Sequence, residues 1–316
     1  MSTKDILIIT MIKGIGPATI KKNIHRLKSL INASDLIKEL KPAELDNLST
    51  YENDADIIIS ICQQEGIEII DITSVAYPSS LLEISNPPAV IYIKGNKKLL
   101  EQKIIAIIGT RHSTELGNMI AERLGGYFSQ RFAICNGLVE GIDEHSIYVN
   151  KKVVPNTIGI ISGGLRYKST CAHNHIRVIE DVLNAGGLII SEYPPMKKED
   201  QYSGSASSRI QAGLSDGIIL VQSKMNGGSK YTLEKFVKLG RVIGIVNFPT
   251  NIEFQDDTFE ANRVIIKEKE RGISKFICLK TNSTINVRAI LPITSKSDYK
   301  TFEDMLVMQR PQLNLF

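Results

Sequence analysis

Small polar residues follow several aliphatic runs in this chain, at places where a backbone could bind an anion. Glycine and hydroxyl residues at the start of a helix expose N–H groups, and arginine adds a charge that pairs with phosphate. The candidates for anion binding are Gly109, Thr110, Arg111, Ser113, Asn136, Gly137, Gly141, Asp143, Gly163, Gly164, Arg166, Gly228 and Ser229. They lie at or shortly after an aliphatic run, and we expect these turns to form an anion or nucleotide cradle.

The aliphatic runs have the length of buried strands. They occupy residues 67–70, 90–93, 104–108, 132–135, 157–161, 188–190, 217–221 and 242–246. Most are apolar on both faces, as strands of a parallel sheet covered on both sides must be. Helical patterns alternate with them, for example over residues 116–128, so we predict an α/β fold with a mostly parallel sheet. In such a sheet, ligands bind beyond the carboxyl ends of the strands, where the candidate residues stand.

Residues 1–65 have a different texture and predict a small helical domain. Apolar residues recur at helical spacing, and glycines interrupt them. The segment 13–22 is similar to a helix-hairpin-helix, in which the turn glycines Gly14 and Gly16 expose N–H groups to a DNA phosphate and Lys21 and Lys22 follow on the second helix. A plain helical hairpin with a solvated basic face explains the same pattern.

Other chemistry finds little support in the sequence. Neither G-x-G-x-x-G nor the Walker motif occurs, so no dinucleotide or ATP cofactor is predicted. Cys171, His173 and His175 alternate along one loop, but they have no distant Cys or His partner in the pattern, and we predict no metal site. No pair of carboxylates has the spacing of a general acid and base, so we predict no catalytic residue.

Composition excludes several classes of protein. The 316 residues are 42% hydrophobic and 23% charged, which is ordinary for a globular protein and argues against disorder. The net charge of +4 permits an anionic partner without requiring one. Four scattered cysteines predict reduced, mostly buried thiols. No apolar stretch could span a membrane, and no secretory signal is recognised at Met1, so we expect no membrane association and a cytoplasmic protein.

Six ordered motifs resemble the DprA/Smf family of DNA-processing proteins. They are Asn-Pro-Pro-Ala-Val-Ile-Tyr-Ile-Lys-Gly at 86–95, Ala-Ile-Ile-Gly-Thr-Arg at 106–111, Asn-Gly-Leu-Val-Glu-Gly-Ile-Asp at 136–143, Gly-Gly-Leu-Ile-Ile-Ser-Glu-Tyr-Pro at 186–194, Arg-Ile-Gln-Ala-Gly-Leu-Ser-Asp at 209–216, and Gly-Ser at 228–229 with Thr232, before Gly-Arg at 240–241. Together they span roughly residues 70–275, which is most of the chain.

The resemblance implies a Rossmann-like core with helices on both faces of the sheet, often preceded by a helix-hairpin-helix or SAM-like domain. It also implies a protein that binds single-stranded DNA, forms homodimers and helps to load RecA without catalysing a reaction. Carried over by motif, Arg111, Gly137, Gly141 with Asp143, and Arg209 would line the DNA pocket. The chain departs from the family pattern at Ser207-Ser208-Arg209, where the family has Arg-Asn-Arg, and at Gly227-Gly228-Ser229, where it has Ser-Gly-Ser.

The last five residues form a separate motif. Gln312, Leu313, Leu315 and Phe316 resemble the Gln-Leu-x-Leu-Phe peptide with which replication and repair proteins dock on the β sliding clamp. A polar anchor followed by alternating large apolar side chains can fill adjacent pockets on a partner. The alternative is a tail that packs on its own core.

These observations divide the chain into a helical domain at 1–65, a Rossmann-like domain at 66–282 and a C-terminal tail at 283–316. We expect a single-stranded DNA-binding protein of DNA processing, recombination, uptake or defence. The alternative is a nucleotide sensor or nucleoside-phosphate N-glycosidase of the same superfamily, whose Gly-Gly-x-Gly-Thr-x-x-Glu signature is only partly matched at 227–234.

Overall fold

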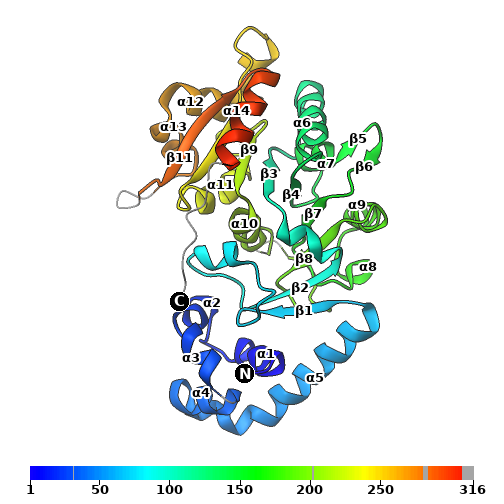
Figure 1. Cartoon of the computed structure of the whole chain (residues 1–316), viewed down its shortest axis with the longest axis vertical. Helices are drawn as coiled ribbons and strands as arrows, with labels where there is room; N and C mark the ends of the chain where they lie inside the picture. Colours follow the sequence, from blue (N-terminus) through cyan, green and yellow to red (C-terminus); the bar gives the residue numbers. More distant parts are fainter. Residues whose placement is uncertain (31, 201–202, 280–283, 308–316) are drawn as a thin grey trace. The chain divides into compact units, whose positions relative to one another are not determined.

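The computed structural model describes residues 1–30, 32–200, 203–279 and 284–307. The chain divides into two compact units (Figure 1). Unit 1 consists of Met1–Gln102 and Pro155–Leu214, and unit 2 consists of Lys103–Val154 and Ser215–Phe316. Each unit is built from two separate stretches of chain, because the strands that pair in it are not consecutive in sequence.

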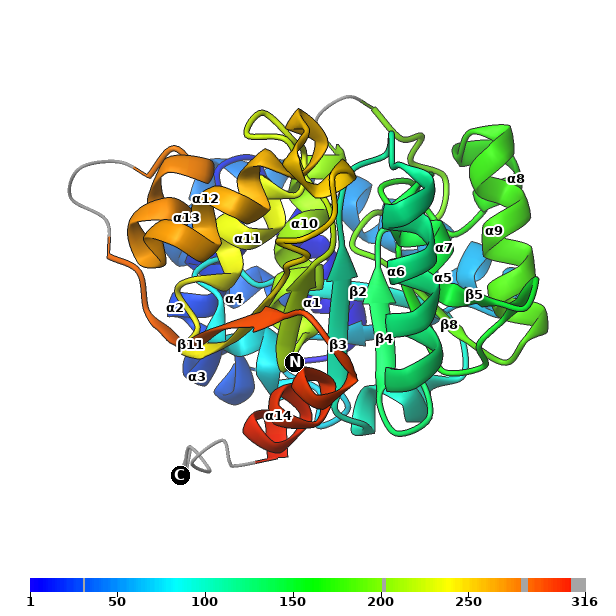
Figure 2. The same ribbon diagram turned by 90° about the horizontal axis from the view of Figure 1, so that it is seen from above.

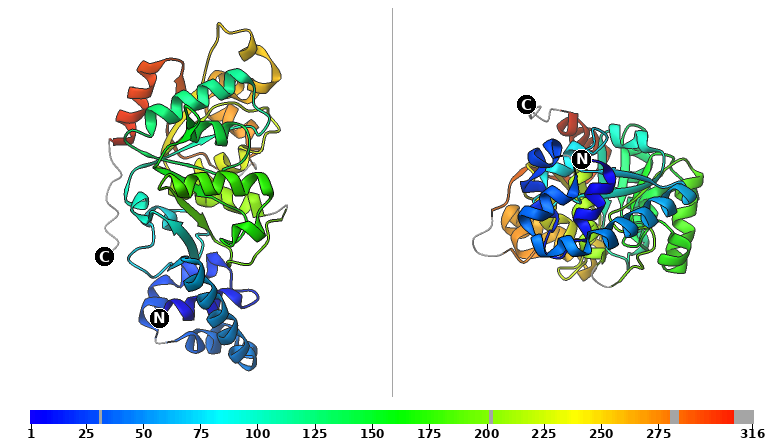
Figure 3. Two further views of the ribbon diagram at one scale, coloured as in Figure 1. Left: turned by 90° about the vertical axis from the view of Figure 1, so that its right-hand side faces the viewer. Right: turned by 90° about the horizontal axis from the view of Figure 1, so that it is seen from below.

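Unit 1 begins with the predicted helical region. Its elements are α1 (Thr3–Met11), α2 (Pro17–Lys22), α3 (Ile24–Ser29), α4 (Ala33–Leu40), the 3-10 helix η1 (Pro42–Asn47) and α5 (Leu48–Glu65). Ser2 and Asp5 form a capping box that starts α1. In Figure 3 the dark blue helices α1 to α4 gather beside α5, and both α1 and α5 contact strand β1. The apolar side of α1, including Ile6 and Ile9, is completely buried.

The strands of unit 1 are ordered β1–β2–β8–β7. Their bounds are β1 (Glu68–Asp71), β2 (Val90–Gly95), β8 (Leu188–Ser191) and β7 (Thr157–Ile160). β7 and β8 are parallel, as predicted, whereas β2 is antiparallel to both of its neighbours. The connection from β1 to β2 contains only the short 3-10 helix η2 (Ser79–Glu83), without the crossover helix that a parallel pair requires. The remaining elements of unit 1 are η3 (Lys97–Glu101), α8 (Tyr167–Thr170), α9 (His173–Asn184) and α10 (Ser203–Leu214).

Unit 2 carries parallel strands in the order β4–β3–β9–β10–β11. They are β4 (Ala133–Asn136), β3 (Ile104–Ile108), β9 (Gly217–Leu220), β10 (Arg241–Val246) and β11 (Val287–Ile293). All five residues of β3 and all six of β10 are buried. The mostly parallel α/β architecture predicted from the sequence is therefore confirmed.

Helices cover both faces of the strands in unit 2. They are α6 (Glu115–Phe128), α7 (Ile142–Ile147), α11 (Lys230–Phe236), α12 (Glu260–Glu268), α13 (Glu270–Phe276) and α14 (Lys296–Val307), with the short 3-10 helices η4 (Glu253–Gln255) and η5 (Asp257–Phe259). Figures 1 and 2 show α14 (red) on one side of β11 and α12 and α13 (orange) on the other. Rings from α6 and α14 form an aromatic cluster, in which Phe128 meets Phe302 edge-on at 5.7 Å. Two short strands, β5 (Tyr148–Val149) and β6 (Lys152–Val153), form a separate hairpin.

The C-terminal part of unit 2 differs from the sequence prediction. Residues 283–316 were expected to form a C-terminal tail outside the Rossmann-like domain. Strand β11 instead pairs with β10, and α14 begins at Lys296. Phe302 and Leu306 pack where a Cβ on Gly217 would stand, so this helix is part of the core. No helix among the described residues is both long and apolar enough to cross a membrane.

Candidate nucleic-acid interface

Three of the four predicted turns meet in unit 2, because β4, β3 and β9 are adjacent and parallel. Backbone hydrogen bonds join the turns. The N–H of Thr110 donates to the carbonyl of Gln222 at 2.9 Å, and the N–H of Ile142 donates to the carbonyl of Thr110 at 3.2 Å. The carboxyl ends of the three strands therefore form one connected surface, as the sequence predicted for this part of the chain.

Two glycines make this close approach possible. A Cβ on Gly109 would lie 2.5 Å from Ile142, and a Cβ on Gly141 would lie 2.4 Å from the carbonyl oxygen of Thr110. Gly141 also has a φ of +81°, which side chains of L-residues rarely tolerate. These glycines shape the turns through backbone packing.

The polar side chains at the end of β4 and at the start of α7 are used inside the protein. Asn136 is fully buried and donates to the carbonyl of Asp143 and to the hydroxyl of Ser146. The carboxylate of Asp143, also buried, accepts a 2.8 Å hydrogen bond from the N–H of Gly137. Asn136 and Asp143 were expected to contact DNA, but the structure uses them to fix the shape of the turn.

Arg111 is placed differently. It stands on the turn between β3 and α6, and its side chain is exposed. Within the ranges that the structure describes, no ion pair or side-chain hydrogen bond engages its guanidinium. Three residues later Thr114 caps α6 by accepting a hydrogen bond from Gly117. The N-terminus of this 14-residue helix carries partial positive charge, so the turn combines a helix end with an available cation.

Other members of this turn support its shape. The hydroxyl of Thr110 accepts from the N–H of His112, and Ser113 donates to Asn118. Gln222, which was not among the predicted site residues, is fully buried and exchanges two 3.0 Å hydrogen bonds with Thr114. A polar residue directly after the apolar run 217–221 is the sequence signal that could have indicated it.

The third turn of unit 2 presents mainly backbone. Ser229 is buried and donates to Ser223, so its hydroxyl faces inward. Gly228 is exposed and has open space where a Cβ would stand. Lys224, in the same turn, is exposed and was not predicted. Glu234, which the alternative glycosidase signature would use, pairs with the adjacent Lys235.

The fourth predicted turn follows β7 and belongs to unit 1. A Cβ on Gly164 would lie 2.1 Å from the carbonyl oxygen of Pro194, and the carbonyl of Gly163 accepts from Ser191. Arg166 forms an ion pair with Glu65 at 2.9 Å. Gly163 and Gly164 are buried against the protein's own chain, and their part in an anion cradle stays a prediction.

Arg209 on α10 is also engaged within unit 1. It is 6% exposed, and its guanidinium forms a bidentate ion pair with Glu192 while Nε donates to the carbonyl of Asn86 at 2.9 Å. Burial opposes the charge, but the hydrogen bonds and charge of Glu192 outweigh it and raise the pKa of Arg209. The place of Arg209 in a DNA pocket stays a prediction, and the structure shows its guanidinium held by Glu192 and Asn86.

The N-terminal hairpin has the expected turn. Gly14 has a φ of +90°, and Gly16 is the N-cap of α2, with open space around its Cα. Lys21 donates to the carbonyl of Ile84 at 2.7 Å, whereas Lys22 is exposed. Of the two predicted DNA-contacting lysines, Lys22 is the one whose side chain faces solvent.

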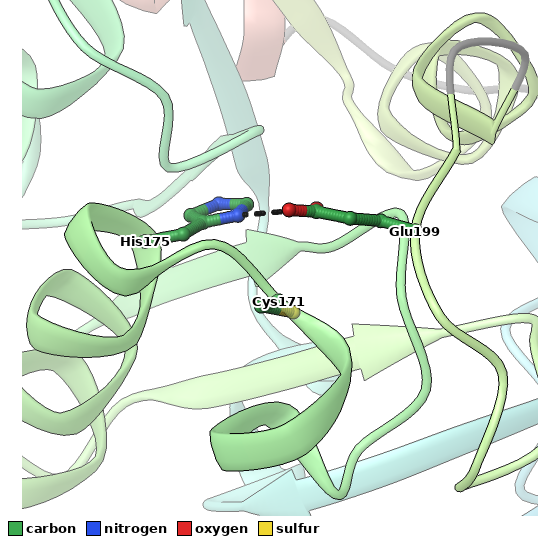
Figure 4. A group of neighbouring side chains, drawn as sticks. All are labelled: Cys171, His175 and Glu199. Atoms are coloured by element: carbon green, nitrogen blue, oxygen red, sulfur yellow. Dashed lines mark ion pairs between the residues drawn. The ribbon is translucent and has the colours of Figure 1, made fainter.

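The segment 171–175, where α8 ends and α9 begins, has a partner that the sequence pattern did not reveal. The side chains of Cys171 and His175 meet Glu199, which follows β8 (Figure 4). The hydrogen bond from His175 lowers the pKa of the Glu199 carboxyl, against the effect of burial.

All four cysteines are free. Cys62 and Cys135 are buried as predicted, and burial raises the pKa of Cys62 to about 12, whereas Cys278 is exposed. The predicted clamp-binding residues Gln312, Leu313, Leu315 and Phe316 lie outside the described residues.

Comparison with known families decides the assignment of the chain. The profile of the family described as DNA recombination-mediator protein A matches residues 68–276. The chain belongs to this family. It is 31% identical over 208 residues to the DNA processing protein DprA of Bacillus subtilis, an alignment that covers 65% of this chain and 69% of that protein. The resemblance to DprA/Smf proteins seen in the motifs is confirmed.

Solved structures of family members share the fold. The X-ray structure of DprA from Streptococcus pneumoniae has a TM-score of 0.68 at 21% identity and covers 95% of this chain and 98% of its own. DprA from Helicobacter pylori, whose structural study describes a single-stranded DNA binding mode, has a TM-score of 0.54 at 24% identity. That match covers 64% of this chain and 87% of the other. Both likenesses concern the fold alone.

Proposed function

We propose that this member of the DNA recombination-mediator family binds single-stranded DNA through the turn between β3 and α6. The observation that carries the proposal is Arg111, an exposed guanidinium at the N-terminus of a helix and at the joined carboxyl ends of three strands. Phosphate oxygens match both the guanidinium and the helix end. The relative from Helicobacter pylori binds the same class of ligand.

The other candidate residues divide into two roles in this proposal. Gly109, Thr110, Ser113 and Gly228 lie on the turns that face the nucleic acid, with Lys224 as an added cation. The remaining predicted residues hold these turns or stabilise their own unit, and they are Asn136, Gly137, Gly141, Asp143, Gly163, Gly164, Arg166, Arg209 and Ser229. Gly14, Gly16 and Lys22 of the hairpin provide a second, weaker DNA contact.

We propose further that the protein acts in the cytoplasm as a binding protein and not as an enzyme. Two carboxylates of the family motifs are engaged within the protein, which supports this, since Asp143 accepts from a backbone N–H and Glu192 pairs with Arg209. Partners of the proposed role are RecA, a second copy of the chain and, through residues 312–316, the β sliding clamp. Release of free base from nucleoside monophosphates by the purified protein would favour the glycosidase alternative instead.

The test is a binding titration with fluorescent oligonucleotides at several salt concentrations. We expect the single strand to bind more tightly than a duplex of the same sequence. The logarithm of the association constant should fall linearly with the logarithm of the salt concentration. Each phosphate contact adds about 0.7 to the slope for single strands. Equal affinity for both forms, or affinity independent of salt, would contradict the proposal.

A further inference from the structure

Three side chains of different chemistry lie close together in unit 1, two from residues 171–175 and one from the turn after β8. The thiol of Cys171, the imidazole of His175 and the carboxylate of Glu199 each offer one ligand atom, and these atoms all lie within 4.8 Å of one another (Figure 4). Cys171 ends α8, His175 is in the first turn of α9, and Glu199 comes from the turn after β8. None of the three has a place in the proposed DNA site.

We propose that Cys171, His175 and Glu199 bind a zinc ion, with water as the fourth ligand. Sulfur, imidazole nitrogen and carboxylate oxygen are the donors of protein zinc sites, and three protein ligands with one open position form a familiar set. The two that pair, His175 Nδ1 and Glu199 Oε2, are 3.7 Å apart. Bonds of about 2.0–2.3 Å in a tetrahedron place ligand atoms roughly 3.3–3.6 Å apart. The His175–Glu199 pair therefore needs only a small contraction, and the Cys171 thiol, which lies within 4.8 Å of the other two ligand atoms, has to move closer to them.

The backbone around the cluster holds the carboxylate in a suitable position. The N–H of Ala172 donates to Oε1 of Glu199 at 2.7 Å, and the N–H of Glu199 donates to the carbonyl of Thr170 at 3.0 Å. Oε1 is thereby fixed by the same loop that carries the other two ligands, and Oε2 is turned toward His175. Such supporting hydrogen bonds to a ligating carboxylate are typical of metal sites.

Charge and proton changes on binding are consistent with this site. On binding, the Cys171 thiol releases its proton to solvent and coordinates as thiolate, and His175 coordinates as neutral imidazole through Nδ1. One thiolate and one carboxylate then balance the two charges of the ion. The zinc would replace the direct contact between His175 and Glu199.

Binding would attach the turn after β8 firmly to the start of α9. A ligand that binds only the folded state stabilises it by mass action. The metal-loaded protein is therefore expected to melt at a higher temperature than the metal-free protein. This effect does not depend on whether DNA binds.

The experiment uses the full chain without an affinity tag, stripped of metal and then titrated with Zn²⁺ and, separately, with Co²⁺. We expect one ion per chain and, with cobalt, the intense visible bands of tetrahedral coordination together with a thiolate-to-cobalt charge-transfer band. Cys171→Ser should abolish the charge-transfer band and weaken zinc binding by more than about 100-fold, beyond the loss caused by removing a merely supporting group. His175→Ala should weaken binding similarly.

Matched controls exist in the same chain. Cys278 is the other accessible thiol, and His173 is the exposed histidine of the same loop, so Cys278→Ser and His173→Ala should retain the ion and its spectrum. Each variant is melted without metal to show that it is folded like the parent. The proposal is overturned if the parent binds no zinc, if the charge-transfer band survives in Cys171→Ser, or if Cys278→Ser removes it. In the first case the cluster is an ion pair beside a thiol.

Discussion

Replacing Arg209 by alanine should destabilise the protein while leaving its affinity for DNA almost unchanged. The guanidinium is 6% exposed, and it satisfies both the Glu192 carboxylate and the carbonyl of Asn86. Its removal leaves a carboxylate that is only 12% exposed without its cation. Breaking a buried ion pair from one side typically costs about 3–5 kcal/mol, a large part of the roughly 5–15 kcal/mol that stabilises a native protein.

The assay is thermal and urea unfolding of the parent, Arg209→Ala and a double variant. For a cooperative unit of about 150–250 residues, each kcal/mol shifts the melting temperature by roughly 2–4 °C, so the single variant should melt roughly 6–20 °C lower. The double variant Arg209→Met with Glu192→Leu should recover at least half of the loss, because two apolar side chains of similar volume can replace a buried pair.

DNA binding is then measured well below the melting temperature of the variant. The Arg209→Ala protein should bind a single-stranded oligonucleotide with an affinity within about twofold of the parent, since no contact to DNA is lost. A tenfold loss of affinity would correspond to about 1.4 kcal/mol. A variant that melts like the parent but binds DNA tenfold more weakly would refute this reasoning and return Arg209 to the DNA pocket.

Other parts of the chain are open to similar tests. In urea unfolding, Gly141→Ala should lower the free energy of unfolding by more than about 1 kcal/mol, because φ is positive and the new Cβ would lie 2.4 Å from a carbonyl oxygen. Gly228→Ala, where a Cβ has open space, should change it by less than about 0.5 kcal/mol. Deleting residues 1–60 should yield an insoluble or unfolded product, since it removes α1 and most of α5, which contact β1; a fragment with cooperative melting would contradict this. A peptide of residues 310–316 should bind purified β clamp at micromolar strength in calorimetry, and changing its last two residues to alanine should abolish the heat; equal heats would argue against docking.

Much of the fold could be predicted from the sequence, because buried strands and amphipathic helices leave strong patterns. The run at 104–108 coincides with β3, and the helical pattern at 116–128 lies within α6. Strand β11 was missed for a physical reason. It lies at the edge of the sheet, most of its residues are only partly buried, and it contains Arg288 and Pro292, which are compatible with an edge but break the apolar pattern.

The candidate site was predictable in position but not in the role of each residue. Periodicity locates the ends of strands, so Arg111 and the glycine turns could be found. Whether a polar side chain faces solvent or the protein depends on partners far along the chain. Asp143 and Arg209 turn inward because the N–H of Gly137 and the carboxylate of Glu192 meet them, and Glu199 joins Cys171 only through the tertiary fold.

The most direct test of the account is the affinity of Arg111→Ala for single-stranded DNA. Arg271→Ala is the matched control, because it removes the same charge from an exposed position in the same unit. Arg271 lies near Val287, the first residue of β11, and therefore not at the carboxyl end of a strand. We expect the Arg111 variant to melt like the parent and to lose more than about 1 kcal/mol of binding free energy, which is about the worth of a charge-assisted hydrogen bond. Its association constant should also depend less steeply on salt concentration. The Arg271 variant should bind like the parent. Equal affinity of the parent and Arg111→Ala across the salt series would contradict the proposed site.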